Sequence, residues 1–78
     1  MFYVYILKCN DGSYYTGHTD DIERRIAEHK GGLYQGYTSS RLPIQLVYLE
    51  EFFSRIEALE AERKIKNWSR KKKRDVDF

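Results

Sequence analysis

Three short stretches of the chain are rich in β-branched and aromatic residues, which favour extended backbone. Residues 2–9 come first, and residues 13–17 and 44–53 have a similar composition. Each stretch has the length of a strand rather than of a helix. The third combines Ile, Leu, Val, Tyr and Phe, and we expect it to be the central strand of a sheet.

Two longer stretches predict helices, and each opens with a capping-box pattern. The first runs from Asp20, with Glu23 three residues on, to about Lys30, where two glycines end it. The second runs from Ser54 to about Trp68. Both helices should therefore begin at a polar side chain that accepts a backbone hydrogen bond.

The remaining segments connect these elements. Residues 31–43 predict an irregular loop because they contain Gly36, a Thr-Ser-Ser run and Pro43. The basic tail, 69–78, is expected to begin as a helix and to fray toward its end. The chain, 1–78, thus fits one α/β (α+β) domain in which a three-stranded antiparallel sheet is flanked by helices.

Positive charge is unevenly distributed, although the net charge is only +2. Residues 63–74 hold eight of the fourteen Lys and Arg residues and no acid. Such a cluster can be a binding surface for a polyanion. It can equally be a solvated helix end whose cations lie near the C-terminal dipole.

Cysteine usage and hydropathy exclude other classes. Cys9 is the one cysteine, so no internal disulfide can form, and we expect it to be a small buried hydrophobic residue. No apolar run is long enough for a signal peptide or a membrane span. We expect a cytoplasmic protein with no membrane partner and no small-molecule cofactor.

Helical geometry identifies polar residues that point inward. In the first predicted helix, Ile22 and Ile26 set the buried face, with His29 inside that face and Arg25 at its edge. A histidine at such a position is more often a hydrogen-bonded core residue than a catalyst. His29 alone therefore favours the structural interpretation.

The second predicted helix places a carboxylate within its apolar face. Glu62 lies near the middle of that face, whose other members are Ala58, Leu59, Ala61, Ile65 and Trp68. A buried carboxylate is costly unless it is paired or bound to a metal. Glu62 could form a structural ion pair with Arg25 or Lys66, but its central position favours a functional role.

These residues follow one another in an order that resembles the GIY-YIG nucleases. The matching residues are Tyr3-Val4-Tyr5, Tyr14-Tyr15-Thr16-Gly17, Arg25, His29 and Glu62. The resemblance covers nearly the whole chain and is greatest to the small standalone bacterial proteins of that family. Two motif positions differ, because Tyr3 replaces the first glycine and Thr16 replaces an isoleucine.

The resemblance implies a phosphodiester-hydrolysing site that uses one divalent cation. Glu62 would hold Mg²⁺, and Arg25 would neutralise charge on the phosphoryl group. Tyr5 and Tyr15 would orient or deprotonate the attacking water, with His29 assisting that proton transfer. Either tyrosine could be the base, with a slight preference for Tyr15.

A shared site requires a particular hairpin register. A two-residue Asp11-Gly12 turn would pair Lys8 with Tyr15 and put Tyr5 and Tyr15 on opposite faces. A three-residue loop that includes Asn10, with Gly12 in the left-handed region, would pair Leu7 with Tyr15 instead. We predict this second register, with the tyrosine, arginine and glutamate side chains on one face of the sheet.

The resemblance favours a Mg²⁺-dependent DNA endonuclease of low sequence specificity, or a nuclease directed by DNA structure. The alternatives are a nucleic-acid-binding module with little or no cleavage, and a protein-interaction domain that uses Trp68 and the basic tail. The oligomeric state is left open. The residues expected to contact nucleic acid are basic ones outside the site: Arg41, Lys66, Arg70, Lys71, Lys72 and Lys73.

Overall fold

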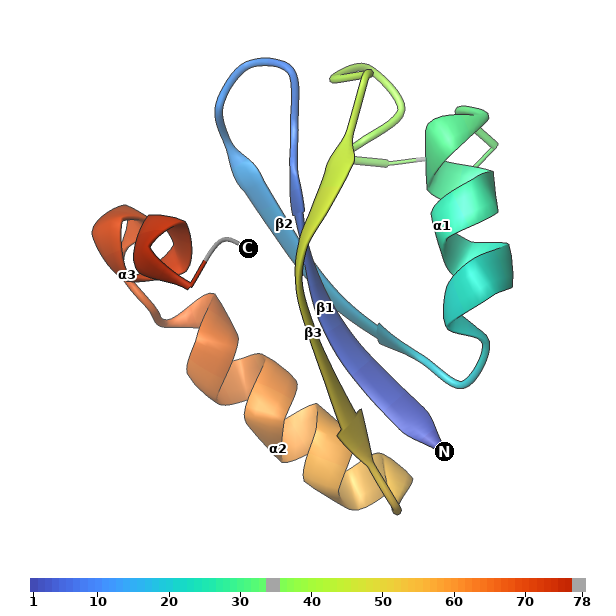
Figure 1. Ribbon diagram of the computed structural model, residues 1–78, viewed down its shortest axis with the longest axis vertical. Helices are drawn as coiled ribbons and strands as arrows, with labels where there is room; N and C mark the ends of the chain where they lie inside the picture. Colours follow the sequence, from blue (N-terminus) through green and yellow to red (C-terminus); the bar gives the residue numbers. More distant parts are fainter. Residues whose placement is uncertain (34–35, 77–78) are drawn as a thin grey trace.

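Three antiparallel strands form one sheet in the computed structural model, which describes residues 1–33 and 36–76. The elements are β1 (Phe2–Lys8), β2 (Tyr14–Thr19), α1 (Ile22–Lys30), β3 (Gln45–Phe52), α2 (Arg55–Lys66) and α3 (Arg70–Asp75). Helix α1 covers one face of the sheet, and α2 and α3 lie on the other side (Figure 1). The predicted α+β architecture is confirmed.

The central strand is β1, because the strand order is β2-β1-β3. The prediction that residues 44–53 form the central strand is therefore wrong. Residues 4–7 of β1 are completely buried, whereas β3 is an edge strand with Glu50 and Glu51 exposed. Helices cover both faces of the sheet, so even an edge strand needs apolar residues, and its composition resembled that of a central one.

The β1–β2 hairpin has the predicted register. Leu7 pairs with Tyr15 and Tyr5 pairs with Gly17. Between the two strands the Cys9 N–H donates to the Ser13 carbonyl at 2.8 Å, which leaves a loop of three residues, and the last of these, Gly12, has a φ of 82°. An alanine at that position would be strained, since L-residues rarely adopt such a φ. Tyr5 and Tyr15 thus lie on the same face of the sheet.

Helix α1 begins one residue later than predicted. Its N-cap is Asp21 rather than Asp20, and the Asp21 carboxylate accepts from the backbone N–H of Arg24 at 3.1 Å. The N–H of Asp21 in turn donates to the Thr19 hydroxyl at 3.1 Å, which fixes the entry of the chain into the helix.

The predicted glycines end α1. The N–H of Leu33 donates to the Glu28 carbonyl at 2.9 Å, and that of Gly32 donates to the His29 carbonyl at 3.2 Å. Gly32 has a φ of 72°. This is the Schellman arrangement, in which a left-handed residue satisfies the last carbonyl groups of a helix.

Helix α2 has the predicted cap. The Ser54 hydroxyl accepts from the N–H of Glu57 at 3.2 Å, but the helix ends at Lys66 rather than at Trp68. The basic tail begins as the helix α3, with Ser69 as N-cap. Residues 34–35 of the predicted loop and 77–78 of the tail lie outside the described residues.

Two apolar clusters lie on opposite faces of the sheet, as the period of two along β1 requires. One cluster contains Val4, Ile6, Val47, Ala58 and Ile65, and joins the sheet to α2. The other contains Tyr5, Leu7, Cys9 and Ile44, with Ile22 and Ile26 of α1 packed against it. Cys9 is buried as predicted, and no described helix is long and apolar enough to cross a membrane.

Candidate active site

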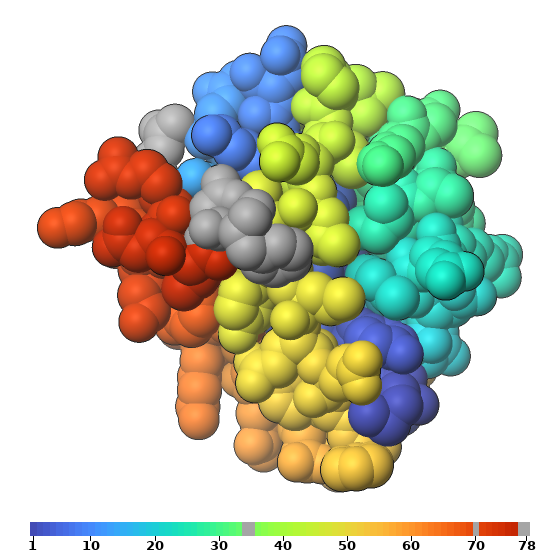
Figure 2. Space-filling model, in the orientation of Figure 1, coloured from blue at the N-terminus to red at the C-terminus, as the bar shows by residue number. Residues whose placement is uncertain are grey.

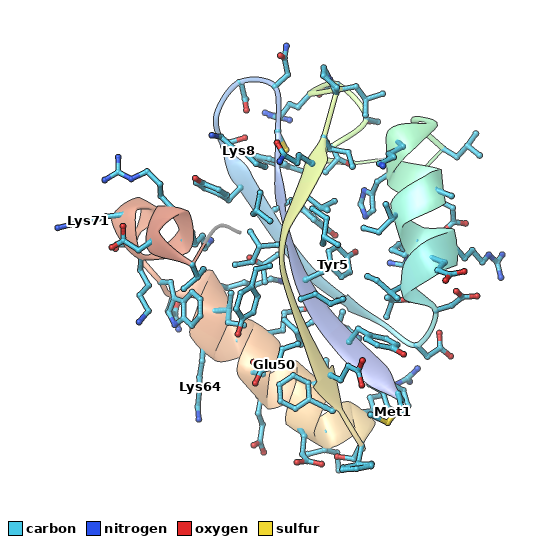
Figure 3. All side chains as sticks on the ribbon, viewed as in Figure 1. Met1, Tyr5, Lys8, Glu50, Lys64 and Lys71 are labelled. Atoms are coloured by element: carbon cyan, nitrogen blue, oxygen red, sulfur yellow. The ribbon has the colours of Figure 1, made fainter. Side chains whose placement is uncertain are left out.

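Two tyrosines and a histidine form a cluster between the sheet and α1. The Tyr5 hydroxyl lies 3.1 Å from Nε2 of His29, and both side chains are fully buried. The ring centroid of Tyr15 lies 6.3 Å from that of Tyr5 and 5.3 Å from that of His29. Figure 3 labels Tyr5 on β1, in the middle of the molecule. The structure therefore brings together three of the five predicted catalytic residues.

Gly17 allows the Tyr5 ring to approach the backbone of β2. A Cβ atom at position 17 would lie 2.6 Å from the Tyr5 hydroxyl oxygen and 3.1 Å from Cε2 of Tyr15. Real Cβ atoms essentially never come this close, so a larger residue at position 17 would have to displace the Tyr5 ring.

A buried threonine holds the other nitrogen of His29. Nδ1 lies 2.6 Å from the Thr38 hydroxyl, and Thr38 is fully buried. Burial, and then the nearby Arg25 guanidinium, lower the pKa of His29 below its usual 6.5. A neutral imidazole has one donor and one acceptor, so Nε2 accepts from Tyr5 when Nδ1 donates to Thr38. The role of Thr38 could not be predicted, since it depends on the path of an irregular loop.

Arg25 lies on α1 one turn before His29. Its side chain is 29% exposed and forms an ion pair with Glu28, with 3.5 Å between Nε and Oε1. Arg25 lines a polar pocket at the start of α1 together with Thr19, Asp20, Asp21, Arg24 and Glu28. The edge position predicted for Arg25 agrees with this partial exposure.

Glu62 lies on the other face of the sheet. The neighbouring α2 residues Ala58 and Ile65 pack in the cluster that contains Val4, whose side chain points away from Tyr5. The prediction that Glu62 shares a face with the tyrosines is therefore wrong. The prediction assumed that a carboxylate on the buried face of its helix would reach the face of the sheet that carries Tyr5 and Tyr15. Helix α2 instead covers the opposite face of the sheet.

The Glu62 carboxylate is held by two cationic or polar partners. Oε1 lies 2.6 Å from Nδ1 of His18, and Oε2 lies 3.0 Å from Nζ of Lys66. Its side chain is only 12% exposed. Burial alone would raise the pKa of Glu62, but the hydrogen bonds from His18 and Lys66 bring it below its usual 4.5. Lys66 is one of the two predicted partners, whereas His18 was missed.

His18 connects the two halves of the site. It follows Gly17 directly in β2 and pairs with Val4, so its side chain points toward α2. β2 is an edge strand of the sheet. Glu62 and the tyrosine cluster therefore lie on opposite faces of the sheet at this edge strand, where Tyr15 and His18 are half-buried and Gly17 is buried.

Glu62 is a chemically reasonable ligand for Mg²⁺. This ion is commonly held by one or two carboxylates, with water and substrate phosphate completing its shell. Among residues 1–33 and 36–76, no group of three or more His, Cys, Asp and Glu side chains could hold a metal by itself. One carboxylate fits an ion whose remaining ligands come from the substrate, provided that Lys66 or His18 releases an oxygen.

The residues predicted to contact nucleic acid have different surroundings. Arg41 bonds to Asp11 at 3.1 Å and lies 3.9 Å from the Tyr37 ring centroid, and Tyr37 stacks on Tyr15. Lys72 lies over the ring of Trp68 at 5.2 Å. The Arg70 side chain is outside the part that the structure describes.

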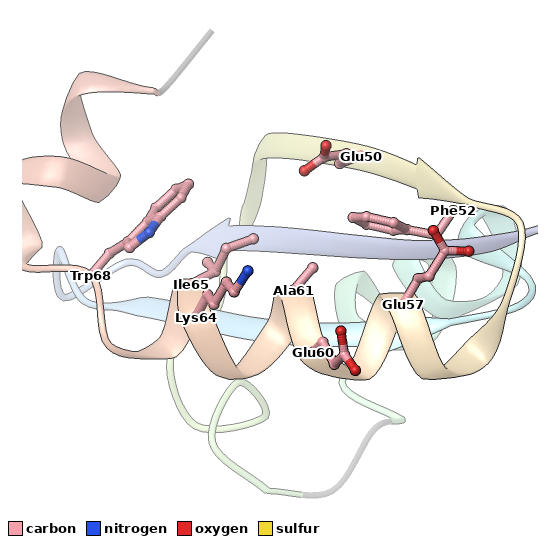
Figure 4. Close-up of a pocket in the computed structure, with 8 residues that line it drawn as sticks. All are labelled: Glu50, Phe52, Glu57, Glu60, Ala61, Lys64, Ile65 and Trp68. Atoms are coloured by element: carbon pink, nitrogen blue, oxygen red, sulfur yellow. The ribbon is translucent and has the colours of Figure 1, made fainter.

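A groove between β3 and α2 is distinct from this site. Figure 4 shows its lining residues, which are Glu50, Phe52, Glu57, Glu60, Ala61, Lys64, Ile65 and Trp68. Three of these are glutamates and one is a lysine. The groove therefore repels a polyanion, and it lies away from the tyrosine cluster, on the α2 side of the sheet.

The profile of the GIY-YIG catalytic domain matches residues 1–75. The chain belongs to the GIY-YIG family. A UPF0213 protein of Staphylococcus saprophyticus is 54% identical to this GIY-YIG chain over 71 residues, which cover 91% of the chain and 87% of the relative. A UPF0213 protein of Halobacterium salinarum is 47% identical over 73 residues, which cover 94% and 95%.

The fold of this GIY-YIG chain is also that of a solved relative. The solution NMR structure of a UPF0213 protein from Bacillus halodurans superimposes with a TM-score of 0.60 and 47% identity, covering 97% of this chain and 82% of that one. The predicted family and its three-stranded architecture are both confirmed.

Proposed function

We propose that the protein is a phosphodiesterase that cleaves DNA with low sequence specificity and depends on Mg²⁺ or another divalent cation. The observation that carries this proposal is the Tyr5–His29 hydrogen bond beside Tyr15, with Glu62 on the opposite face of the sheet bonded to His18 of β2. A scissile phosphate bound at this edge, beside the half-buried Tyr15 and His18, would lie between the tyrosine cluster and the carboxylate.

The tyrosine cluster would activate the attacking water. The lowered pKa of His29 keeps its imidazole neutral near pH 7, so Nε2 can take the proton of the Tyr5 hydroxyl while the Tyr5 oxygen takes one from the attacking water. Thr38 fixes the orientation of the imidazole through Nδ1. Tyr15, in contact with both rings, would orient the water toward the phosphorus.

Arg25 and Glu62 would act on the charge of the phosphate. Arg25 is partly exposed and adjacent to His29, so its guanidinium can turn toward a phosphate oxygen. Glu62 would hold Mg²⁺, which polarises the scissile phosphate as a Lewis acid. Lys66 would then exchange its contact with Glu62 for one with the phosphate backbone.

The runner-up function is nucleic-acid binding without cleavage. It is favoured by the state of Glu62, because each carboxylate oxygen already has a partner in His18 or Lys66. A protein that never releases these contacts would keep the basic surface but could not bind the cation.

A cytoplasmic location stays a prediction.

The two functions differ in one experiment. Nicked, branched and linear DNA are incubated with the protein, with and without Mg²⁺, beside Glu62→Gln and the control Glu60→Gln, an exposed glutamate on the same helix. We expect metal-dependent cutting by the wild type and the control, and loss of cutting in Glu62→Gln. Salt-sensitive binding without any cutting would instead support the binding module.

A further inference from the structure

A pocket between the hairpin and α3 concentrates positive charge away from the candidate active site. It has a volume of about 290 Å³ and is lined by Lys8, Gly12, Tyr14, Lys71 and Arg74. Figure 3 labels Lys8 near the hairpin loop and Lys71 on the neighbouring helix. Two elements far apart in the sequence therefore contribute cations to one pocket.

No carboxylate neutralises these cations among the described residues. The ion pairs found there use Arg24, Arg25, Arg41, Lys66 and His18, but not Lys8, Lys71 or Arg74. All three are exposed, and the side chains of α3 project from one side of the molecule (Figure 2). Like charges this close repel one another, so a bound anion would stabilise the arrangement.

The pocket rests on a rigid support. Tyr14, Trp68 and Val76 all pack against the apolar cluster beneath α2, so the two ends of α3 and the hairpin share one core. Gly12 holds the loop in its left-handed turn. The spacing of the cations is therefore set by the fold as well as by their flexible side chains.

A second pocket connects this one to the candidate active site. It is lined by Ser13, Tyr14, Tyr37 and Lys73, and so shares Tyr14 with the first. Tyr37 stacks on Tyr15 with ring centroids 6.2 Å apart. On the other side, burial and the nearby charge of Lys66 lower the pKa of Lys73. Lys73 therefore lies between the first pocket and Lys66, the lysine that forms an ion pair with Glu62.

We propose that Lys8, Lys71 and Arg74 form a phosphate-binding subsite that holds a backbone phosphate of the DNA strand whose scissile phosphate lies at the β2 edge. That the bound phosphate belongs to DNA rests on the proposed function. The subsite fixes the position of the strand through its backbone, and it therefore adds affinity without reading bases.

The test measures DNA affinity without metal, so that cleavage plays no part. The double variant Lys8→Ala/Arg74→Ala is compared with Arg63→Ala/Lys64→Ala, which removes two exposed charges from α2. Fluorescence anisotropy gives Kd for a short DNA duplex over a range of salt concentrations. We expect weaker binding by the first variant and a salt slope smaller by about one, because the subsite holds one backbone phosphate and each lost phosphate contact removes about 0.9 from the slope.

Several results would overturn the subsite. Equal effects of the two double variants would show a diffuse charge contribution, and an unchanged salt slope would show that the pocket touches no phosphate. If the loss of affinity were seen only with duplexes that carry a 5′-phosphate, the pocket would bind a terminal phosphate instead of a backbone phosphate. Melting temperatures of both variants establish that each is folded. The comparison with Glu62→Gln tests cleavage separately. The proposed nuclease activity can therefore be refuted without refuting the subsite, and the subsite can be refuted without refuting the nuclease activity.

Discussion

The close approach of Tyr5 to Gly17 makes Gly17→Ala an informative substitution. The added Cβ would lie 2.6 Å from the Tyr5 hydroxyl oxygen and 2.7 Å from Cζ, whereas ordinary contact begins near 3.4 Å. The ring must therefore move by about 0.8 Å. Tyr5 is fully buried and bonds to His29, so this movement disturbs both the packing and that hydrogen bond.

The expected cost follows from opposing effects. Overpacking a buried site costs about 1–3 kcal/mol, and weakening the Tyr5–His29 hydrogen bond adds about 1 kcal/mol. Alanine favours a strand over glycine by roughly 0.5–1 kcal/mol, which offsets part of this. The free energy of unfolding should fall by about 1–3 kcal/mol in Gly17→Ala. For a domain of this size, the melting temperature should fall by about 5–20 °C.

Urea unfolding followed by Trp68 fluorescence measures this change. Gly31→Ala is the matched control, because Gly31 has a φ of −81° and its Cβ would lie 3.3 Å from the nearest atom, the Ala27 carbonyl oxygen. The control should change stability by less than about 1 kcal/mol. In the Tyr5→Phe background, which lacks the closest atom, Gly17→Ala should cost less. A Gly17→Ala protein as stable as the control would refute the close approach.

Two further predictions concern His29. Thr38→Val should lower the free energy of unfolding by about 1–3 kcal/mol because it removes the hydroxyl that bonds to the buried Nδ1 of His29, whereas Thr38→Ser should cost less. Equal costs in urea unfolding would contradict this. The unfolded chain binds a proton more readily than the folded one, since the folded pKa of His29 is below 6.5, so stability should fall as the pH drops below that value. The urea midpoint should show this loss as the pH falls below 6.5 in the wild type but not in His29→Gln, whereas the lowered pKa of Glu62 adds a loss of stability only below pH 4.5.

Local signals in the sequence predicted the parts of the site that depend on local geometry. The glycine of the hairpin loop set the register of Tyr5 and Tyr15, because loop length determines which residues pair. Helical periodicity predicted that His29 and Glu62 point inward, since their apolar neighbours define the buried faces.

Long-range placement could not be predicted in the same way. Both Tyr5 and Glu62 are inward-facing, but which face of the sheet α2 covers depends on the connection from β3. His18 could have been found from the hairpin, because the predicted register already paired it with Val4. Its contact with Glu62 required knowing that α2 lies beneath that pair. Thr38 had no local signal.

The position of β1 in the middle of the sheet affects how the chain can assemble during synthesis. β1 leaves the ribosome first and can pair with β2 within the hairpin, but β3 begins only at Gln45. The edge of β1 that pairs with β3 therefore stays unpaired until most of the chain has been made. Removal of the first eight residues would delete the central strand β1 and separate β2 from β3, rather than remove an edge strand. Once the fold is complete, the amide hydrogens of β1 should be among the slowest to exchange with solvent.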